Sequence, residues 1–116
     1  MNEVAREGSL LDVSALIPAF NEELTLRKIV NSTKRFVSEV LVVNDHSTDD
    51  TETIARRTGA RVLRNTFDRG RHFAHLFGIR SIENEIIVTL NADGQHLPEK
   101  IPRLLEPIRR GNQTTL

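Results

Sequence analysis

The sequence predicts an α/β fold: a Rossmann-like, doubly wound, mostly parallel sheet of about four strands with helices on both faces. Two observations support this fold class. Short apolar runs alternate with amphipathic stretches along the chain, and the runs at residues 40–43 and 86–90 are apolar at nearly every position. Strands that are apolar on both faces are typical of parallel sheets covered by helices on both sides. Right-handed crossovers are expected between them.

The first strand–helix unit is expected to begin with a strand at residues 12–19. A helix with Leu26, Ile29 and Val30 on one face should follow it. The Asn-Glu-Glu segment at residues 21–23 is expected to supply the N-cap and the first-turn acids of this helix.

The second unit pairs a strand at residues 39–44 with a helix at residues 50–58. Asp49 and Glu52 have the spacing of a capping box, and Gly59 is expected to end the helix. On this interpretation Asp49 is a helix-capping residue.

The third unit is expected to have a short strand at residues 61–64 and a helix carrying Phe73, Leu76 and Phe77. The fourth has a strand at residues 85–92, a loop, and a helix that opens at Pro98 and ends at Gly111. One stripe of that last helix carries Ile101, Leu104, Leu105 and Ile108.

We expect one domain at residues 12–111, between a polar N-terminal segment at 1–11 and a polar tail at 112–116. A chain of 116 residues can bury one core. Sixteen basic residues balance sixteen acidic ones, which argues against a nucleic-acid partner. The chain has no cysteine, which excludes thiolate metal sites, and no secretory signal or bilayer-spanning stretch, so a cytoplasmic location is expected.

Acidic side chains follow both apolar strands. Asp45 follows the strand at residues 39–44, and Asp93 follows the strand at residues 85–92. Because parallel strands end at one edge of their sheet, we expect these two carboxylates to line one crevice.

Three segments resemble motifs of glycosyltransferase family 2, in the right order: Ile17-Pro18-Ala19-Phe20-Asn21-Glu22, residues 42–51 around Asn44-Asp45, and residues 91–99 from Asn91 to Glu99. The likeness runs from about residue 13 to residue 111 and is closest to the polyprenyl-phosphate sugar transferases, such as dolichol-phosphate mannose synthase. Gly70-Arg71 with Ala74 and Gly78 is similar to a further glycine-containing family segment.

The resemblance implies a truncated GT-A fold that binds a UDP- or GDP-linked sugar at the carboxyl edge of the sheet. A divalent ion, Mg²⁺ or Mn²⁺, would bridge the diphosphate, with Asp93 and Gln95 as its ligands. The implied nucleotide-binding residues are Pro18, Ala19, Phe20, Glu22, Asp45 and Asn91. The chain departs from the family at three positions: Phe20 stands where Tyr is usual, and Asn44 and Asn91 stand where Asp is usual.

Three functional hypotheses remain open from the sequence. The first is a metal-dependent glycosyltransferase domain that transfers a sugar to an acceptor such as a polyprenyl phosphate, which implies peripheral membrane attachment. The second is a nucleotide-sugar-binding module without turnover, or a truncated, inactive transferase, because the acceptor half is missing and no catalytic base is evident. The third is a receiver-like signalling domain with Asp45 as phosphoacceptor, against which the lack of a suitably placed lysine counts.

Three further interpretations concern partners and side chains outside the motifs. The strand at residues 85–92 would expose an apolar edge, which favours self-association or a separately encoded partner. His72 and His75 lie three residues apart on an expected helix, which would allow, but does not favour, a zinc site. Arg64, Arg69 and Arg71 form a basic cluster that could contact a diphosphate or could simply be solvated.

Overall fold

The computed structural model describes residues 13–65, 78–84, 86–93 and 98–109, with the side chains of the last three positions left undescribed. Four parallel strands form one sheet in the order β3-β2-β1-β4. They are β1 (Val13–Ala19), β2 (Glu39–Asp45), β3 (Arg61–Asn65) and β4 (Ile86–Thr89). The helical elements are α2 (Leu26–Thr33), α3 (Thr51–Arg57), the 3₁₀ turn η2 (Pro98–Lys100) and α5 (Ile101–Arg109). The predicted α/β fold class is confirmed.

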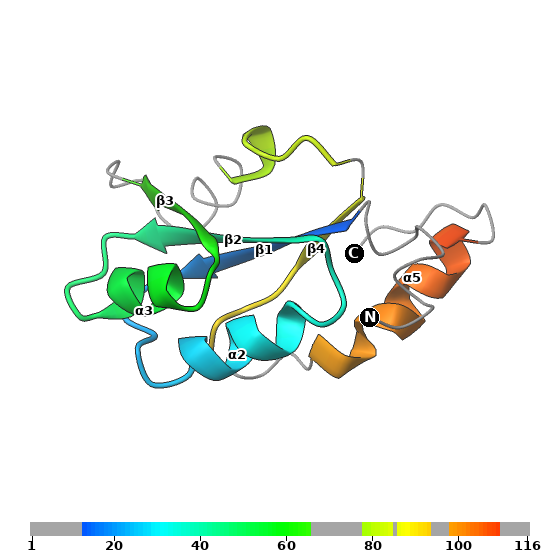
Figure 1. The fold of residues 1–116 in the computed structure, drawn as a ribbon. Coiled ribbons are helices and arrows are strands. Elements are labelled where there is room, and N and C mark those ends of the chain that lie inside the picture. Colours follow the sequence, from blue (N-terminus) through cyan, green and yellow to red (C-terminus); the bar gives the residue numbers. More distant parts are fainter. Residues whose placement is uncertain (1–12, 66–77, 85, 94–97, 110–116) are drawn as a thin grey trace.

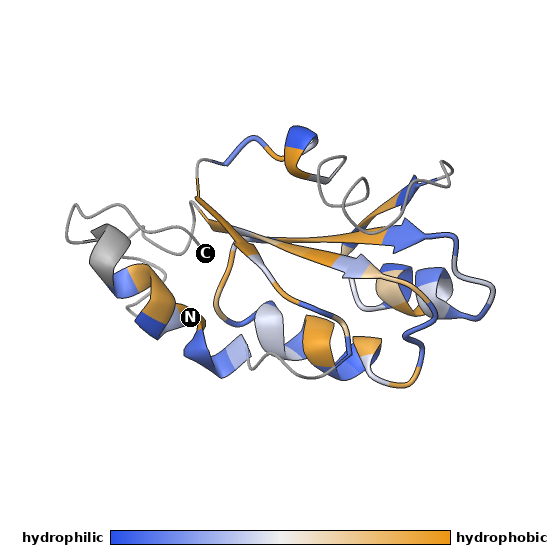
Figure 2. Cartoon of the chain, turned by 180° about the vertical axis from the view of Figure 1, so that it is seen from behind, coloured by the Kyte–Doolittle hydropathy of each residue, from blue (hydrophilic) through white to orange (hydrophobic). Residues whose placement is uncertain are grey.

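Helical segments cover both faces of the sheet. Figure 1 shows α2 and α3 on one side of the strands and the helical turn at residues 78–80 on the other. Figure 2 shows the middle of the sheet as hydrophobic, with hydrophilic colour concentrated on the turns. This is the layering expected of buried parallel strands.

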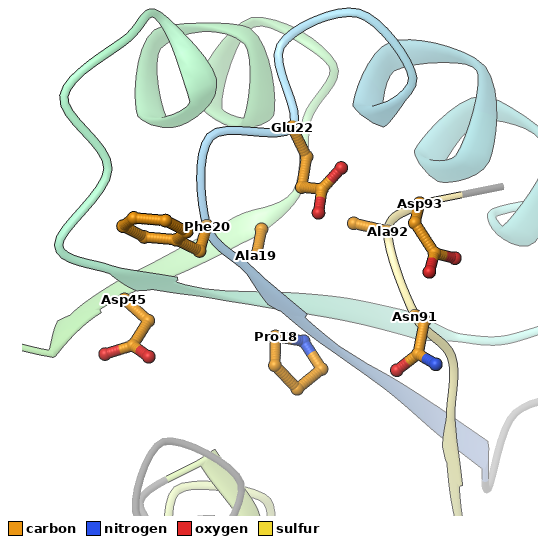
Figure 3. Close-up of a pocket in the computed structure, with 8 residues that line it drawn as sticks. All are labelled: Pro18, Ala19, Phe20, Glu22, Asp45, Asn91, Ala92 and Asp93. Carbon is orange, nitrogen blue, oxygen red and sulfur yellow. The ribbon is translucent and has the colours of Figure 1, made fainter. Parts of the chain in front are cut away.

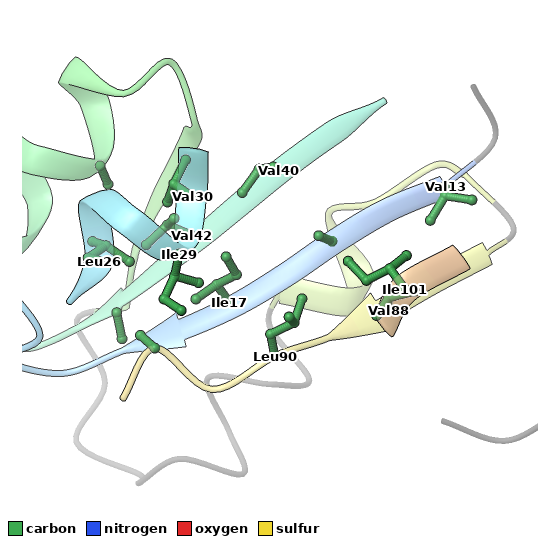
Figure 4. Close-up of a cluster of buried hydrophobic side chains, with 14 of the residues drawn as sticks. Val13, Ile17, Leu26, Ile29, Val30, Val40, Val42, Val88, Leu90 and Ile101 are labelled. Atoms are coloured by element: carbon green, nitrogen blue, oxygen red, sulfur yellow. The ribbon is translucent and has the colours of Figure 1, made fainter. Parts of the chain in front are cut away.

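The larger core lies between the sheet and α2, α3 and α5. Alternate strand residues such as Ile17 and Val42 point to this side and are fully buried. Figure 4 shows them packed against α2 and against Ile101 of α5. The three predicted core residues of α2, Leu26, Ile29 and Val30, all belong to this cluster.

The smaller core lies on the opposite face. Leu16, Leu41 and Val43 are fully buried there, with Ile79 and Ile82 packed against them. The residues between them along β1 and β2 belong to the larger core, so the period of two residues assigns each strand position to one face.

The start of α2 differs from the prediction. The helix begins at Leu26, its N-cap is Thr25, and its first turn contains no acid. Asn21 adopts a left-handed conformation with φ 51°. Its side chain accepts a hydrogen bond from the backbone N–H of Thr48, in the loop after β2, so it is not free to cap α2.

The predicted capping box of α3 does not form, because the N-cap residue is Asp50 and makes no side-chain cap hydrogen bond. Asp49, the residue before it, accepts a hydrogen bond from the Thr51 N–H at 2.9 Å. Glu52 instead turns to Asn44 and Arg64. Gly59, with φ +88°, follows the end of α3 as predicted.

The fourth unit also differs in detail. β4 ends at Thr89, although the Leu90 N–H still donates to the Leu16 carbonyl at 3.0 Å. Pro98 opens the 3₁₀ turn η2, after which α5 begins. Ile101 and Leu105 are buried as predicted, whereas Leu104 is 43% exposed.

Several predictions fall outside the described residues. These are the terminal segments 1–11 and 112–116, the helix carrying Phe73, Leu76 and Phe77, the predicted metal ligand Gln95, and His72, His75, His96, Arg69, Arg71 and Gly111. Within the residues that are described, no helix has the length and apolar character needed to cross a membrane.

Gly78 sits directly against the sheet. A Cβ atom built there would lie 2.4 Å from Leu16 Cδ1 and 2.9 Å from Val43 Cγ2, closer than real carbon atoms approach. The helical turn at residues 78–80 can therefore approach the smaller core this closely only with glycine at position 78.

Replacing Gly78 by Ala is expected to lower the free energy of unfolding by about 1–3 kcal/mol, because the added methyl group overpacks the smaller core. Chemical denaturation measures the change. Arg80→Ala, at an exposed position of the same turn, is the matched control and should stay within about 0.5 kcal/mol of the parent. Equal stability of Gly78→Ala and Arg80→Ala would contradict this packing.

Candidate functional site

One pocket lies at the carboxyl edge of the sheet. It has about 350 Å³ of empty volume, part of it open to solvent. Figure 3 shows its wall built from the ends of β1 and β2 and from the segment after β4. Its lining residues are Pro18, Ala19, Phe20, Glu22, Asp45, Asn91, Ala92 and Asp93.

The topology places the pocket at this point. The chain builds outward from β1 through β2 to β3 and then returns to the other side of β1 to form β4. Such a reversal in strand order leaves a crevice at the carboxyl ends of the strands. Asp45 and Asp93 line the same crevice, as the sequence predicted.

All six residues predicted to contact a nucleotide line this pocket, and so does the predicted metal ligand Asp93. Gln95 lies outside the described residues. Ala92 is the one lining residue that was not predicted. Its side chain is apolar and its residue 2% exposed, so no chemical signal in the sequence marked it.

The carboxylate of Asp45 is held from the side of β3. Its Oδ1 atom accepts a hydrogen bond from Asn65 Nδ2 at 2.9 Å and lies 3.1 Å from His46 Nδ1. Asn65 is 1% exposed and pairs directly with Asp45 in the β2–β3 ladder. No local pattern in the sequence marks Asn65, because its role depends on this pairing.

Asn44 faces away from the pocket. It is 5% exposed, donates a hydrogen bond to Glu52 Oε1 at 2.9 Å and accepts one from the Ser47 N–H at 3.1 Å. A carboxylate at position 44 would meet the carboxylate of Glu52. Asn44, at the position where the family usually has Asp, therefore avoids charge repulsion with Glu52 of α3 and donates a hydrogen bond to it.

The loops after β1 and β2 are joined by hydrogen bonds between side chains and backbone. The N–H groups of Asn21 and Glu22 donate to Ser47 Oγ and Thr51 Oγ1, each at 2.9 Å. The Glu23 N–H donates to Asp49 at 3.3 Å, and in return Asn21 accepts from Thr48. These bonds fix the two loops relative to each other beside the pocket.

The segment after β4 is attached to the same framework. The hydroxyl of Thr25, the N-cap residue of α2, donates to the carbonyl oxygen of Ala92. Because Ala92 lies between Asn91 and Asp93, this bond ties the predicted metal-binding segment to the start of α2. Three chain segments that are distant in sequence thus share one hydrogen-bonded rim.

Arg64 belongs to a different cluster. Its Nη2 atom lies 2.6 Å from Glu52 Oε2 and its Nε donates to Glu52 Oε1 at 2.9 Å. It lines a separate polar hollow together with Asn44 and Glu52. The sequence left two interpretations of Arg64, contact with a diphosphate or simple solvation. The structure shows a third role, an ion pair with Glu52 of α3.

Contacts in these loops lower the pKa of two carboxyl groups, Glu52 and Asp49. The hydrogen bond from Arg64, and then that from Asn44, lower the pKa of Glu52 to about 2. Burial opposes a decrease in the pKa of Asp49, but the hydrogen bonds from Thr51 and Glu23 outweigh burial and lower it. These hydrogen bonds therefore stabilise both carboxylates in the ionised form.

The pocket offers oxygen ligands for a hard cation. The carboxylate of Asp93 is exposed, and the amide of Asn91 and the carboxylate of Glu22 line the same pocket. Oxygen donors of this kind suit Mg²⁺ and Mn²⁺. In the described part of the chain, however, no group of three or more His, Cys, Asp or Glu side chains could hold a metal ion.

Replacing Glu52 by Gln is expected to lower the free energy of unfolding by about 1–2 kcal/mol at pH 7. Because the folded pKa of about 2 lies below the ordinary value of 4.5, the ionised Glu52 stabilises the fold above about pH 4.5, and this contribution is lost as the pH falls toward 2. Denaturation of parent and variant from pH 7 to pH 2 should therefore show converging stabilities. Glu99→Gln, at an exposed position, is the control; a difference that stays constant over this range would refute the role of the ionised Glu52.

Relatives of this chain include enzymes of lipid-linked sugar transfer. The dolichol-phosphate mannosyltransferase of Pyrococcus furiosus is 31% identical over 114 residues, which cover 91% of this chain and 32% of that protein. The undecaprenyl-phosphate 4-deoxy-4-formamido-L-arabinose transferase of Edwardsiella ictaluri is 34% identical over 113 residues, covering 85% of this chain and 34% of that protein. The chain thus spans about a third of the length of these two relatives.

Solved structures give the same fold. The Mycobacterium tuberculosis glucosyl-3-phosphoglycerate synthase in complex with Mn²⁺, UDP and glucosyl-3-phosphoglycerate superposes with a TM-score of 0.76 and 28% identity, over 90% of this chain and 41% of that chain. Its complex with Mg²⁺ and UDP gives a TM-score of 0.75. Residues 14–115 match the sequence model of glycosyl transferase family 2. This match excludes the receiver-like hypothesis, and the chain belongs to glycosyl transferase family 2.

Proposed function

We propose that this chain binds a nucleotide-diphosphate sugar, together with a divalent metal ion, for transfer of the sugar to an acceptor. The observation that carries the proposal is that one pocket collects Asp45, Asp93 and Glu22 from the ends of three different strands. Relatives named as sugar transferases, and the structural neighbour crystallised with Mn²⁺ and UDP, support the same assignment.

The pocket wall provides distinct groups for the parts of such a donor. Phe20 is 53% exposed and offers an apolar surface for a base or ribose, without the phenolic contact that Tyr would add. The carboxylate of Asp45 can accept hydrogen bonds from ring N–H groups of the base. Asn91 can contact the ribose or phosphates with its amide.

Asp93 and Gln95 are the proposed ligands of Mg²⁺ or Mn²⁺. A bound ion would neutralise charge on the diphosphate leaving group. Because Asn91 takes the place of a carboxylate, the metal-binding segment supplies one negative charge fewer than the family pattern. We therefore propose that donor phosphates complete the coordination, so that metal and nucleotide sugar bind together.

The acceptor is proposed from the named relatives to be a polyprenyl phosphate. A phosphate acceptor is already ionised near pH 7 and needs no general base for its attack on the sugar. Its apolar chain would reside in a membrane, so peripheral membrane attachment is part of this proposal. The chain spans only part of its relatives, and transfer is accordingly proposed for the whole protein to which this pocket belongs.

A binding module without turnover is the alternative. It is favoured by Asn91, which removes one carboxylate from the predicted metal segment. Both hypotheses require donor binding. They differ in whether the bound sugar is ever transferred or hydrolysed.

Calorimetry with UDP-glucose and Mn²⁺ tests the shared requirement. Asp45→Ala and Asp93→Asn should each weaken binding roughly tenfold, because the first removes a charged hydrogen-bond acceptor and the second a metal-ligand charge. Glu83→Gln, at an exposed position outside the pocket, should bind like the parent.

Omitting Mn²⁺ should weaken binding to the parent and abolish the difference between the parent and Asp93→Asn. Donor binding that depends on neither carboxylate would refute the assignment of this pocket. Release or transfer of glucose in a paired assay with polyprenyl phosphate supports the transferase, and binding without release supports the binding module.

We also propose that the chain associates with itself or with a partner through the outer side of β4. In the described part of the sheet β4 is an edge strand, paired only with β1, and it carries Ile86 and Ile87. An apolar edge with unpaired backbone groups favours strand addition. Light scattering over a concentration series should show a mass that rises above the monomer, and a constant monomeric mass would contradict self-association.

A further inference from the structure

The two oxygen atoms of Asp45 are not equivalent. Oδ1 receives Asn65 Nδ2 at 2.9 Å and lies 3.1 Å from His46 Nδ1. An ionised carboxylate has no hydrogen to donate, so both nitrogen atoms act as donors in these contacts. Two donors use both lone pairs of Oδ1.

The other oxygen, Oδ2, accepts no hydrogen bond from the residues that the structure describes. Asp45 nevertheless lines the pocket, and its side chain is only 16% exposed. Oδ2 is therefore the oxygen of this lining residue that keeps its full acceptor capacity for a ligand.

Asn65, which orients the carboxylate of Asp45, is itself held in place by the sheet. Asn65 is the last residue of β3, is 1% exposed, and is the register partner of Asp45 in the parallel ladder. A buried amide in a strand has little freedom to turn away from its neighbour. His46, by contrast, is in a loop, has φ 66° and has a side chain that is 37% exposed.

The bases of nucleotide sugars present different edges to such an acceptor. Uracil presents one N–H donor between two carbonyl oxygens, so one acceptor oxygen satisfies it. Guanine presents two adjacent donors, its ring N–H and its exocyclic amino group, which both oxygens of a free carboxylate would satisfy together. With Oδ1 already used, one guanine donor would be left without a partner, which is costly in a desolvated site.

We propose that Asn65 acts as a positioning residue that turns Asp45 into a single-acceptor site and so selects uridine over guanosine donors. This inference rests on the proposed nucleotide-sugar function and adds the base to it. It assigns base selection to a buried residue of β3 that does not itself line the pocket.

The test is calorimetric titration of the full chain, in Mn²⁺, with UDP, GDP and inosine diphosphate. Inosine diphosphate has the size of GDP but lacks the amino group, so it separates hydrogen-bonding from steric effects. The parent should bind UDP at least about tenfold more tightly than GDP, and GDP no more tightly than inosine diphosphate.

Asn65→Ala should free one lone pair of Oδ1, so that GDP gains several-fold over inosine diphosphate while UDP weakens. Asn84→Ala is the matched control: Asn84 also donates through its side-chain amide, to Ser14, but lies at the amino end of the sheet. It should leave the order of the three nucleotides unchanged. His46→Gly, which suits the positive φ, removes the second donor and should shift the ratios in the same direction as Asn65→Ala.

The outcomes distinguish failure of the base-selection inference from failure of the proposed nucleotide-binding function. If the parent binds GDP as tightly as UDP, or prefers GDP to inosine diphosphate, the single-acceptor inference is overturned while the nucleotide site stands. If none of the three nucleotides binds, the proposed function fails and this inference with it. The relative affinities of the parent for UDP, GDP and inosine diphosphate test the single-acceptor site even if Asn65→Ala does not fold.

Discussion

Parallel pairing around β1 is the constraint on which the rest of this structure depends. Because β2 and β4 both run alongside β1 in the same direction, their carboxyl ends reach one edge of the sheet. The buried apolar residues on both faces hold this register, since a shift by one residue would exchange the faces of a whole strand. Polar residues that follow the strands are thereby delivered to a single pocket.

The rim of the pocket is then made rigid by short polar side chains that bond to backbone. The side chains of Asn21, Ser47 and Thr51 accept hydrogen bonds from backbone N–H groups across two loops that are some thirty residues apart in sequence. The hydroxyl of Thr25 connects these loops to Ala92. Side chains of this length lose little conformational entropy when they are ordered. A site held in this way is pre-formed, so a ligand need not meet the cost of ordering the loops.

Strand alternation divides the polar residues of the second motif between two tasks. Asn44 turns toward α3, where Glu52 and Arg64 form a hydrogen-bonded and ion-paired cluster with it. Asp45 turns the other way, to the pocket and to Asn65. A substitution that looks in sequence like the loss of an acidic ligand is, in the fold, the neutral partner that an adjacent carboxylate requires.

The sequence by itself determined the α/β class, the four strands, the buried face of α2 and the meeting of Asp45 and Asp93 in one pocket, because apolar periodicity and the parallel-sheet rule act through near neighbours in the chain. It misplaced the start of α2 and the capping box of α3, because Asn21 and Glu52 found partners on other segments. Only the tertiary structure decided that Asn65 stands behind Asp45, that Arg64 pairs with Glu52, and that Gly78 leaves room for a helical turn on the sheet. Each of these contacts joins residues a dozen or more positions apart, and no local pattern encodes such a distance.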